Sequence, residues 1–372
     1  MGGVYTLVGL VDEWLEEKSL SDDERFKEGQ VIINNLCAYI RSPFTLASHY
    51  DELSQDSPTP EGIYKDKKEE FYVDKATLDS ETDVRLSIIK EIHDRIQGPG
   101  KNTPRAWSDF EYDFSGSTFF YPIDLTNSYY AKPINFSDSI YQSRADFSGS
   151  TYRDEAYFGG STYQGGADFG GSTYKDVADF GGSTYQGRAD FSRSTYQWAY
   201  FSDSTYQWAY FSDSTYKSWA YFSDSTYENE TNFSGSIFYQ ETYFGEDGYS
   251  NSSSCFTNRA PQFYDKKKRK NTLFGSPNND FTVDIDKGYP IDLDSKGIPL
   301  NCKFLTSEQK EYLEGKLQEI EKINNKLFEV KDLAKKTELL KKLRSLNEEL
   351  HKWREEVTTV KVEDSAIENT ES

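Results

Sequence analysis

Residues that can carry out acid–base or metal chemistry are few in this chain, and their spacing is unfavourable. Its three histidines lie far apart and fall in no metal-binding or triad pattern: His49, His93 and His351. Aspartates recur at multiples of eleven residues: Asp146, Asp168, Asp179 and Asp190. Paired carboxylates can act as acid and base, but carboxylates that recur in one phase of a periodic sequence are better explained as a solvated row. We therefore expect no catalytic residue, no metal ligand, no cofactor and no enzymatic activity.

These aspartates belong to a repeat that fills the middle of the chain. Successive copies from residue 145 read ADFSGSTYRDE, AYFGGSTYQGG and ADFGGSTYKDV. A first aromatic anchor recurs every ten or eleven residues: Phe147, Phe158, Phe169, Phe180, Phe191, Phe201, Phe211, Phe222 and Phe233. A second anchor follows five residues later: Tyr152, Tyr163, Tyr174, Tyr185, Tyr196, Tyr206, Tyr216 and Tyr227. A short fixed period sustained this long predicts a solenoid.

The spacing of the anchors excludes a single helix and a flat strand. A helical period of 3.6 residues would distribute the anchors around the circumference, so that they would share no face. An interval of five residues is odd, so an extended strand would place the two anchors on opposite faces unless the chain turned between them. We therefore predict a mainly β solenoid of short strands, with the anchors inside and a corner after each anchor.

The motif A-(D/N)-F-x-G-S-T-Y resembles the pentapeptide-repeat family in an eleven-residue, aromatic-rich variant. The resemblance implies a right-handed quadrilateral β-helix in which four pentads make one coil. One coil here then takes about 22 residues, and residues 114–244 make about six coils. The extra residue after every second pentad departs from the family pattern, and it implies bulged or enlarged corners.

Residues 1–105 are predicted to be helical, with helices near 4–15, 22–41 and 82–97 and a mobile loop over 45–78. The segments INNLCAYIRSPF, DVRLSIIKEIHDRI and AWSDFEYDFSGSTF resemble a bacterial line of pentapeptide-repeat proteins. In that line HEAT-like helices, often preceded by membrane helices, come before the repeats. The resemblance implies a soluble relative or a shortened form of such a protein. Repeat arrays need capped ends, so these helices are expected to cap the repeats of residues 106–250.

The C-terminal part is predicted to contain an irregular linker over 251–304, one long helix or a helical hairpin over 305–357, and a disordered tail over 358–372. A hairpin would break near residues 335–337. The helix carries an apolar seam with coiled-coil spacing: Leu339, Leu343, Leu346, Leu350, Trp353 and Val357. Either this seam packs on the solenoid as a cap, or it forms a homodimer through the C-terminal helix.

Aromatic residues replace the usual aspartate before several anchors. Four faces per coil would place one group on one side of the solenoid: Trp198, Tyr200, Trp219 and Tyr221. Trp208 and Tyr210 would fall on the opposite side. Such a stack can be a self-supporting ladder, as cross-strand aromatic pairs are. It can also be an exposed interaction face for a protein or a sugar.

The composition restricts which classes of partner and which cellular location we expect for this protein. The net charge is −21 over 372 residues, which argues against direct DNA binding because that surface requires clustered Lys and Arg. Cys37, Cys255 and Cys302 are scattered, which favours a reducing, cytoplasmic location. No run of 18 apolar residues exists, so we expect no membrane span.

Together these features predict a non-catalytic scaffold or protein-interaction module with a protein partner that the sequence does not identify. The alternative is an acidic DNA mimic that acts on a topoisomerase, an activity known among pentapeptide-repeat proteins. A third hypothesis is binding of a carbohydrate or another ligand through the exposed aromatic face. The net charge of −21 is compatible with all three hypotheses.

Overall fold

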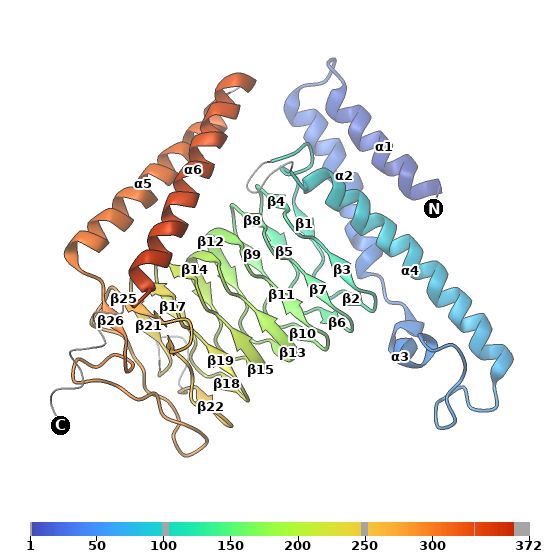
Figure 1. The fold of residues 1–372 in the computed structure, drawn as a ribbon. Coiled ribbons are helices and arrows are strands. Elements are labelled where there is room, and N and C mark those ends of the chain that lie inside the picture. The colour runs from blue at the N-terminus through green and yellow to red at the C-terminus, as the bar shows by residue number, and fades with distance from the viewer. Residues whose placement is uncertain (1, 99–103, 247–251, 331, 361–372) are drawn as a thin grey trace.

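A β-solenoid of about six turns forms the centre of the molecule, and helices flank it at both ends (Figure 1). The computed structural model describes residues 2–98, 104–246, 252–330 and 332–360. The core of the solenoid, which carries the regular repeats, covers residues 112–243. The predicted fold class, a β-solenoid between N-terminal and C-terminal helices, is confirmed.

Each coil has four sides, numbered here in chain order. Side 1 contains strands β1 (Tyr112–Asp113), β5 (Ile134–Asn135), β9 (Ala156–Tyr157), β17 (Ala220–Tyr221) and β21 (Thr242–Tyr243). Side 4 contains β4 (Tyr129–Tyr130), β8 (Thr151–Tyr152), β16 (Thr215–Tyr216), β20 (Ile237–Phe238), β25 (Leu273–Phe274) and β26 (Lys303–Phe304). The longer strands β12 (Thr173–Asp179) and β14 (Thr195–Tyr200) run from side 4 into side 1.

The other two sides are built in the same way. Side 2 contains β2 (Thr118–Phe119), β6 (Ile140–Tyr141), β10 (Thr162–Tyr163), β18 (Thr226–Tyr227) and β22 (Cys255–Phe256). Side 3 contains β3 (Ile123–Asp124), β7 (Ala145–Asp146), β11 (Ala167–Asp168) and β19 (Thr231–Asn232). Strands β13 (Thr184–Asp190) and β15 (Thr205–Tyr210) span sides 2 and 3. Neighbouring strands on every side are parallel, and Thr pairs with Thr and Ala with Ala from β7 to β15.

The aromatic anchors fill the interior. Every anchor predicted from Phe147 to Phe233 is buried, with at most 1 % of its surface exposed. Phe180 shows the packing: its ring stacks on Phe158 and Phe201 with centroids 5.3 and 5.1 Å apart. It also meets Phe169 and Phe191 edge to face at 5.0 Å. Stacked and edge-to-face contacts are the two arrangements that aromatic rings prefer, so the core is a continuous aromatic column.

A ladder of buried serines closes the interior beside the aromatic column. Ser172 illustrates it: its N–H donates to the Ser194 hydroxyl at 3.1 Å, one coil further on. The Ser194 hydroxyl in turn donates to the Phe169 carbonyl at 3.3 Å. Since the repeat leaves space only for a small side chain here, serine supplies partners for main-chain groups that strand pairing leaves unpaired.

The corners explain the Gly/Asp alternation of the repeat. The second residue after each first anchor has a left-handed backbone, with φ of 70° at Gly160 and 56° at Asp138. A Cβ on Gly160 would lie 2.3 Å from the Asp138 carboxylate oxygen, so glycine relieves both the conformation and the crowding. The ten-residue copies omit one corner residue, and the register accordingly shifts between Tyr174 and Val177.

The N-terminal helices cover the first coil. They are α1 (Gly2–Glu16), α2 (Asp22–Arg41), the 3-10 helix η1 (Thr45–His49), α3 (Tyr50–Leu53) and α4 (Lys68–Ile96). Arg41 on α2 pairs with Asp113 on β1, and His93 on α4 contacts the Thr126 carbonyl at 2.7 Å. The ring of Phe26 lies 5.5 Å from that of Phe110, which extends the solenoid core into the helices.

Helix α4 differs from its predicted range, because it begins at Lys68 and not near residue 82. The predicted loop over 45–78 also contains η1 and α3. Phe71 and Leu78 are buried and lie on the same face as Ile88 and Ile92. The apolar pattern of this long helix was not recognised in the sequence, because charged side chains dominate the first half of the helix.

The segment predicted as an irregular linker, 251–304, continues the solenoid where it is described. β22 pairs with β18, β25 pairs with β20, and β26 pairs with β25. Four phenylalanines extend the aromatic column onto the preceding coil: Phe256, Phe263, Phe274 and Phe281. Loops of unequal length separate these phenylalanines, so the period of the sequence is lost although the stacking persists. One of these loops contains the antiparallel pair β23 (Tyr264–Asp265) and β24 (Lys270–Asn271).

The C-terminal segment is a helical hairpin of α5 (Ser307–Glu329) and α6 (Leu333–Thr358). The chain breaks before Leu333, earlier than the predicted 335–337. The capping box of Thr306 and Gln309 is present, as its sequence indicates. Leu343 and Leu346 are buried against Ile320 and Ile323 of α5. Leu350, Trp353 and Val357 pack against a second buried cluster, which joins the solenoid to the start of α5: Ile237, Leu273, Leu305 and Leu313. The predicted seam therefore has a partner within its own chain.

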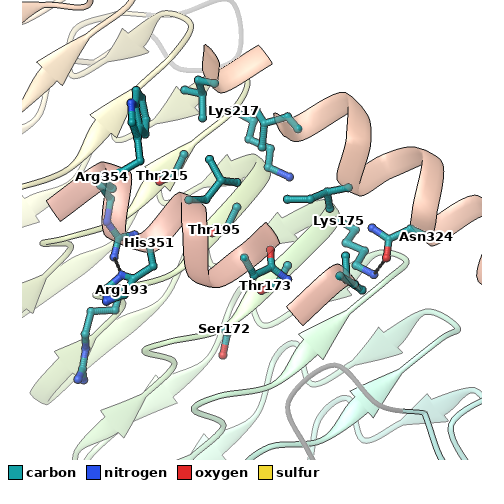
Figure 2. A pocket seen from close by; sticks show the side chains of 17 residues that line it. Ser172, Thr173, Lys175, Arg193, Thr195, Thr215, Lys217, Asn324, His351 and Arg354 are labelled. Atoms are coloured by element: carbon teal, nitrogen blue, oxygen red, sulfur yellow. Dashed lines mark hydrogen bonds between the residues drawn. The ribbon is translucent and has the colours of Figure 1, made fainter. Parts of the chain in front are cut away.

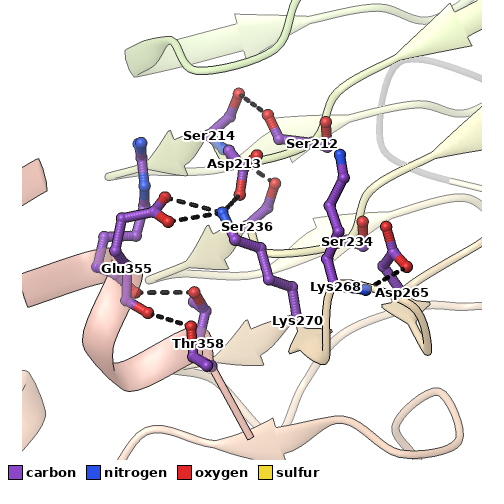
Figure 3. A network of polar contacts seen from close by, with 12 residues as sticks. Ser212, Asp213, Ser214, Ser234, Ser236, Asp265, Lys268, Lys270, Glu355 and Thr358 are labelled. Atoms are coloured by element: carbon purple, nitrogen blue, oxygen red, sulfur yellow. Dashed lines mark hydrogen bonds and ion pairs between the residues drawn. The ribbon is translucent and has the colours of Figure 1, made fainter. Parts of the chain in front are cut away.

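A polar clamp fixes the end of the hairpin to the solenoid (Figure 3). The Lys270 ammonium lies 2.6 Å from the Asp213 carboxylate and 2.8 Å from that of Glu355 on α6. The Val360 N–H donates to the Arg269 carbonyl at 2.8 Å. The predicted tail beyond residue 360 lies outside the described residues. Within the described part of the chain, no helix is both long and apolar enough to span a bilayer.

Candidate functional site

The outward residues of side 1 form a column that crosses five coils: Tyr157, Asp179, Tyr200, Tyr221 and Tyr243. Adjacent members are register partners on neighbouring parallel strands. Tyr200 stacks on Tyr221 at 5.0 Å, and Tyr221 stacks on Tyr243 at 5.3 Å. Asp179 interrupts this aromatic column, because it stands one coil from Tyr157 and one coil from Tyr200.

A groove of about 720 Å³ lies along this column. Tyr157 and Tyr200 flank Asp179, and strands two coils apart place these tyrosines roughly 10 Å from each other. Gly159 and Gly181 line the adjoining corners, where other coils carry serine. The groove therefore exists because one coil presents a short carboxylate between two coils that present tyrosines, and because the corners at Gly159 and Gly181 carry no side chain.

The groove has a negative floor. One oxygen of Asp179 accepts the Gly181 N–H at 2.9 Å, and Asp179 has no ion pair with any cation among the described residues. Burial raises the pKa of Asp179 above its ordinary value. On side 3, by contrast, Arg144 and Arg188 lie 2.7 Å from Asp146 and Asp190. Asp179 on side 1 is thus available to pair with an external cation.

Tyr157 adds a second acidic feature at the rim. Hydrogen bonding to the Glu155 carboxylate, together with burial, raises the pKa of Tyr157 to about 12. The Glu155 carboxylate therefore lies beside Tyr157 and adds negative charge near the groove. Tyrosine faces and carboxylates attract the same chemical class, namely ammonium and guanidinium groups.

The predicted interaction face divides into two parts. Tyr200 and Tyr221 line the groove, whereas Trp198 and Trp219 lie at the neighbouring corner with centroids 5.4 Å apart. Trp219 is 41 % exposed and donates its indole N–H to Glu241 at 2.8 Å. The stacking gives these residues the contacts of a ladder, while their exposure leaves an aromatic surface. Trp208 pairs in register with Arg188 on side 3, away from the groove.

The residues considered first for chemistry are not brought together. His49 lies beside Tyr64, His93 contacts Thr126, and His351 contacts Arg354. The described residues contain no group of three metal-ligand side chains. All three cysteines are buried, and burial raises the pKa of Cys37 and of Cys302 to about 12, so neither thiol is an activated nucleophile.

Sequence reasoning placed Asp179 in a solvated carboxylate row and missed the groove. A signal was present in the repeat itself. The copy that contains Asp179 retains aspartate and Gly-Gly, while the copies one coil before and after it carry Tyr157 and Tyr200 at the same position. Comparing residues one coil apart, instead of one repeat apart, brings out this contrast.

No protein-family model matches this chain, and no curated protein or solved structure matches it either. What the side 1 groove does must therefore be inferred from its own geometry and charge.

Proposed function

We propose that this protein is a non-catalytic β-helical scaffold of the pentapeptide-repeat type, and that its side 1 groove binds a cationic segment of a protein partner. The observation that carries the proposal is Asp179, a half-buried carboxylate that lies between two outward tyrosines and has no ion pair within the described part of the chain. Four-sided coils, two-residue strands and left-handed corners support the assignment to the pentapeptide-repeat type.

The dimensions suit a lysine or arginine side chain. A cation is attracted to an aromatic face when it lies within about 6 Å of the ring centroid. Tyrosines roughly 10 Å apart allow one cation to approach both rings while it pairs with the carboxylate beneath. The parallel strands hold these groups rigidly, so little conformational entropy is lost on binding. The net charge of −21 adds long-range attraction for a basic partner.

Titration with a fluorescent hexalysine peptide tests the groove, with hexaglutamate as the negative control. We expect Asp179→Asn to weaken hexalysine binding by about tenfold, because it removes the charge and keeps the shape. Tyr200→Ala should weaken binding as well. Asp146→Asn is the matched control, since Asp146 already pairs with Arg144. Equal losses in Asp146→Asn and Asp179→Asn would show that the peptide follows net charge alone, and the groove assignment would be wrong.

One observation favours the DNA-mimic alternative. Side 3 carries a straight row of register-paired carboxylates: Asp124, Asp146, Asp168 and Asp190. Arg144 and Arg188 neutralise part of that row, which weakens the resemblance to a phosphate backbone. Gyrase supercoiling in the presence of a quinolone separates the two functions. The scaffold proposal expects no protection, and protection that is lost on Asp168→Asn would favour mimicry.

A further inference from the structure

The C-terminal hairpin does not pack flat on the solenoid. A cavity of about 160 Å³ lies between α5, α6 and side 4 (Figure 2). Its floor is a column of threonines on neighbouring strands: Thr173, Thr195 and Thr215. Its roof is apolar: Leu313, Leu317, Ile320, Leu343, Leu350 and Trp353. The cavity is therefore amphipathic, with hydroxyl groups below and hydrocarbon above.

Cations gather around this cavity although the protein as a whole is acidic. Four basic side chains line it: Lys175, Arg193, Lys217 and Arg354. Figure 2 shows Lys175 and Lys217 on the solenoid floor and Arg354 on the helix above. No aspartate or glutamate is among the residues that line the cavity. The nearest acidic influences are Glu321 on Lys217, and Asp213 and Glu355 on Arg354.

Arg354 is the decisive residue. It is only 6 % exposed, and among the described residues its side chain makes one hydrogen bond, to the His351 ring nitrogen at 2.9 Å. Its buried Nε has no hydrogen-bond partner among the described residues. Asp213 and Glu355, the nearby carboxylates, are engaged by Lys270. A buried guanidinium without a carboxylate partner is costly, so an anion inside the cavity would stabilise it.

The lysines support the same conclusion. Lys175 donates to the Asn324 side-chain oxygen at 2.9 Å, while the Lys217 ammonium makes no hydrogen bond or ion pair among the described residues. Burial lowers the pKa of Lys175 to about 7 and that of Lys217 to about 8. A helix that served only to cover the solenoid would be held better by apolar residues than by these cations.

Size and lining together select the ligand class. A cavity of roughly 150 Å³ accommodates benzene, so a cavity of about 160 Å³ suits a small molecule of that size. The polar floor and basic groups fit a carboxylate, and the leucines and Trp353 fit a hydrocarbon body. A groove of about 530 Å³ adjoins the cavity and shares Lys175 and Lys217 with it.

We propose that the cavity beneath the C-terminal hairpin is a binding site for a small organic carboxylate with an apolar body, of about the size of benzoate. The carboxylate pairs with Lys217, and the apolar body contacts the hairpin leucines. Arg354, which lies beside Arg193 and Asp213, adds positive potential from the other end of the cavity. The site is separate from the side 1 groove and does not depend on the function proposed for that groove.

Calorimetric titration of the full chain with benzoate tests this site. Benzamide serves as the neutral isostere, and inorganic phosphate serves as an anion without an apolar body. We expect benzoate to bind and to raise the melting temperature, and we expect benzamide and phosphate to bind more weakly by about tenfold or more. Lys217→Met should reduce benzoate affinity by a similar factor, whereas Lys296→Met, an exposed cation far from the cavity, should leave it unchanged.

The outcomes are distinct. Lys217→Met removes a buried charge and keeps the length of the side chain, so the variant should fold with a melting temperature no lower than the parent's. Phosphate that binds as tightly as benzoate would overturn the organic-acid assignment. Benzoate that fails to bind the parent, or that binds Lys217→Met and Arg354→Met as tightly as the parent, would overturn the site itself.

Discussion

Ten stacked tyrosines in the core predict a steep alkaline unfolding. They are Tyr130, Tyr141, Tyr152, Tyr163, Tyr174, Tyr185, Tyr196, Tyr206, Tyr216 and Tyr227. Burial raises the pKa of each one, because a phenolate in this aromatic column would lose its hydration. In the unfolded chain the same side chains ionise near pH 10. The folded state therefore keeps protons that the unfolded chain loses, and stability falls as pH rises above about 10.

The magnitude follows from linkage. At pH 10.5 each buried tyrosine costs the folded state about 0.8 kcal/mol relative to the unfolded chain, and at pH 11 about 1.4 kcal/mol. Ten such groups remove about 8 kcal/mol at pH 10.5 and about 14 kcal/mol at pH 11. A typical domain has a free energy of unfolding of roughly 5 to 15 kcal/mol. The solenoid should therefore unfold cooperatively between about pH 10.5 and 11.

Two signals measured together check this prediction: circular dichroism for the strands and absorbance near the phenolate band for ionisation. Both should change at the same pH. Tyr163→Phe provides the matched variant, because Phe119 and Phe238 already occupy the same position in their coils and stack on Tyr141 and Tyr216. The Tyr163 hydroxyl has no hydrogen-bond partner among the described residues, so the variant should match the parent's stability at pH 7. At pH 11 it should be more stable than the parent by about 1.4 kcal/mol.

The result that would refute this reasoning is specific. If the core tyrosines ionised near pH 10 while the circular dichroism stayed native, their hydroxyls would have access to water, and the closed aromatic column would be wrong.

Three further predictions concern the core and its ends. Phe180→Asp should unfold the solenoid by burying an unpaired charge. Phe180→Ala should cost about 4 kcal/mol of unfolding free energy, and Phe180→Leu less than about 2 kcal/mol, since Leu125 occupies the same position naturally. Urea denaturation measures all three variants, and a Phe180→Asp variant with the parent's stability would contradict the inward position of this anchor. Ser194→Ala should lower the free energy of unfolding by about 1 to 3 kcal/mol, because it leaves the Ser172 N–H unpaired. The control Ser252→Ala, at an exposed position, should change it by less than about 0.5 kcal/mol. Equal effects of the two substitutions would show that the serine ladder does not stabilise the fold. In sedimentation, the full chain should be a monomer, because α5 and the solenoid cover the α6 seam. A chain ending at Asn301 should self-associate through Ile237 and Leu273, which the truncation exposes. A dimer of the full chain would contradict this prediction and would indicate that the seam forms an intermolecular contact.

The sequence was sufficient wherever each residue interacts with its own neighbours along the repeat. Phe147 and Tyr152 could be placed inside because a coil stacks the same residue types on one another at a fixed interval. Such local and nearest-neighbour contacts leave a period in the sequence, and the period determines the solenoid.

The additional coil after residue 252 was not predicted, because its anchors do not recur at a constant spacing. Phe256 and Phe274 stack like the earlier anchors, but the loops between them have no constant length. Stacking requires only that the rings meet in space, whereas recognition in sequence requires a constant spacing. The long helix α4 was shortened for a related reason, since buried Phe71 lies among charged residues.

Only the tertiary structure decided where the hairpin lies and what it encloses. Arg354 on α6 and Lys217 on the solenoid are far apart in the chain, and no period relates them. They line the same cavity only because of how the apolar seam of α6 fits α5 and side 4, which is a property of surfaces and not of spacing. In the same way Asp179 gained a site from the tyrosines one coil before and after it, because the coil, not the eleven-residue repeat, sets which side chains become neighbours.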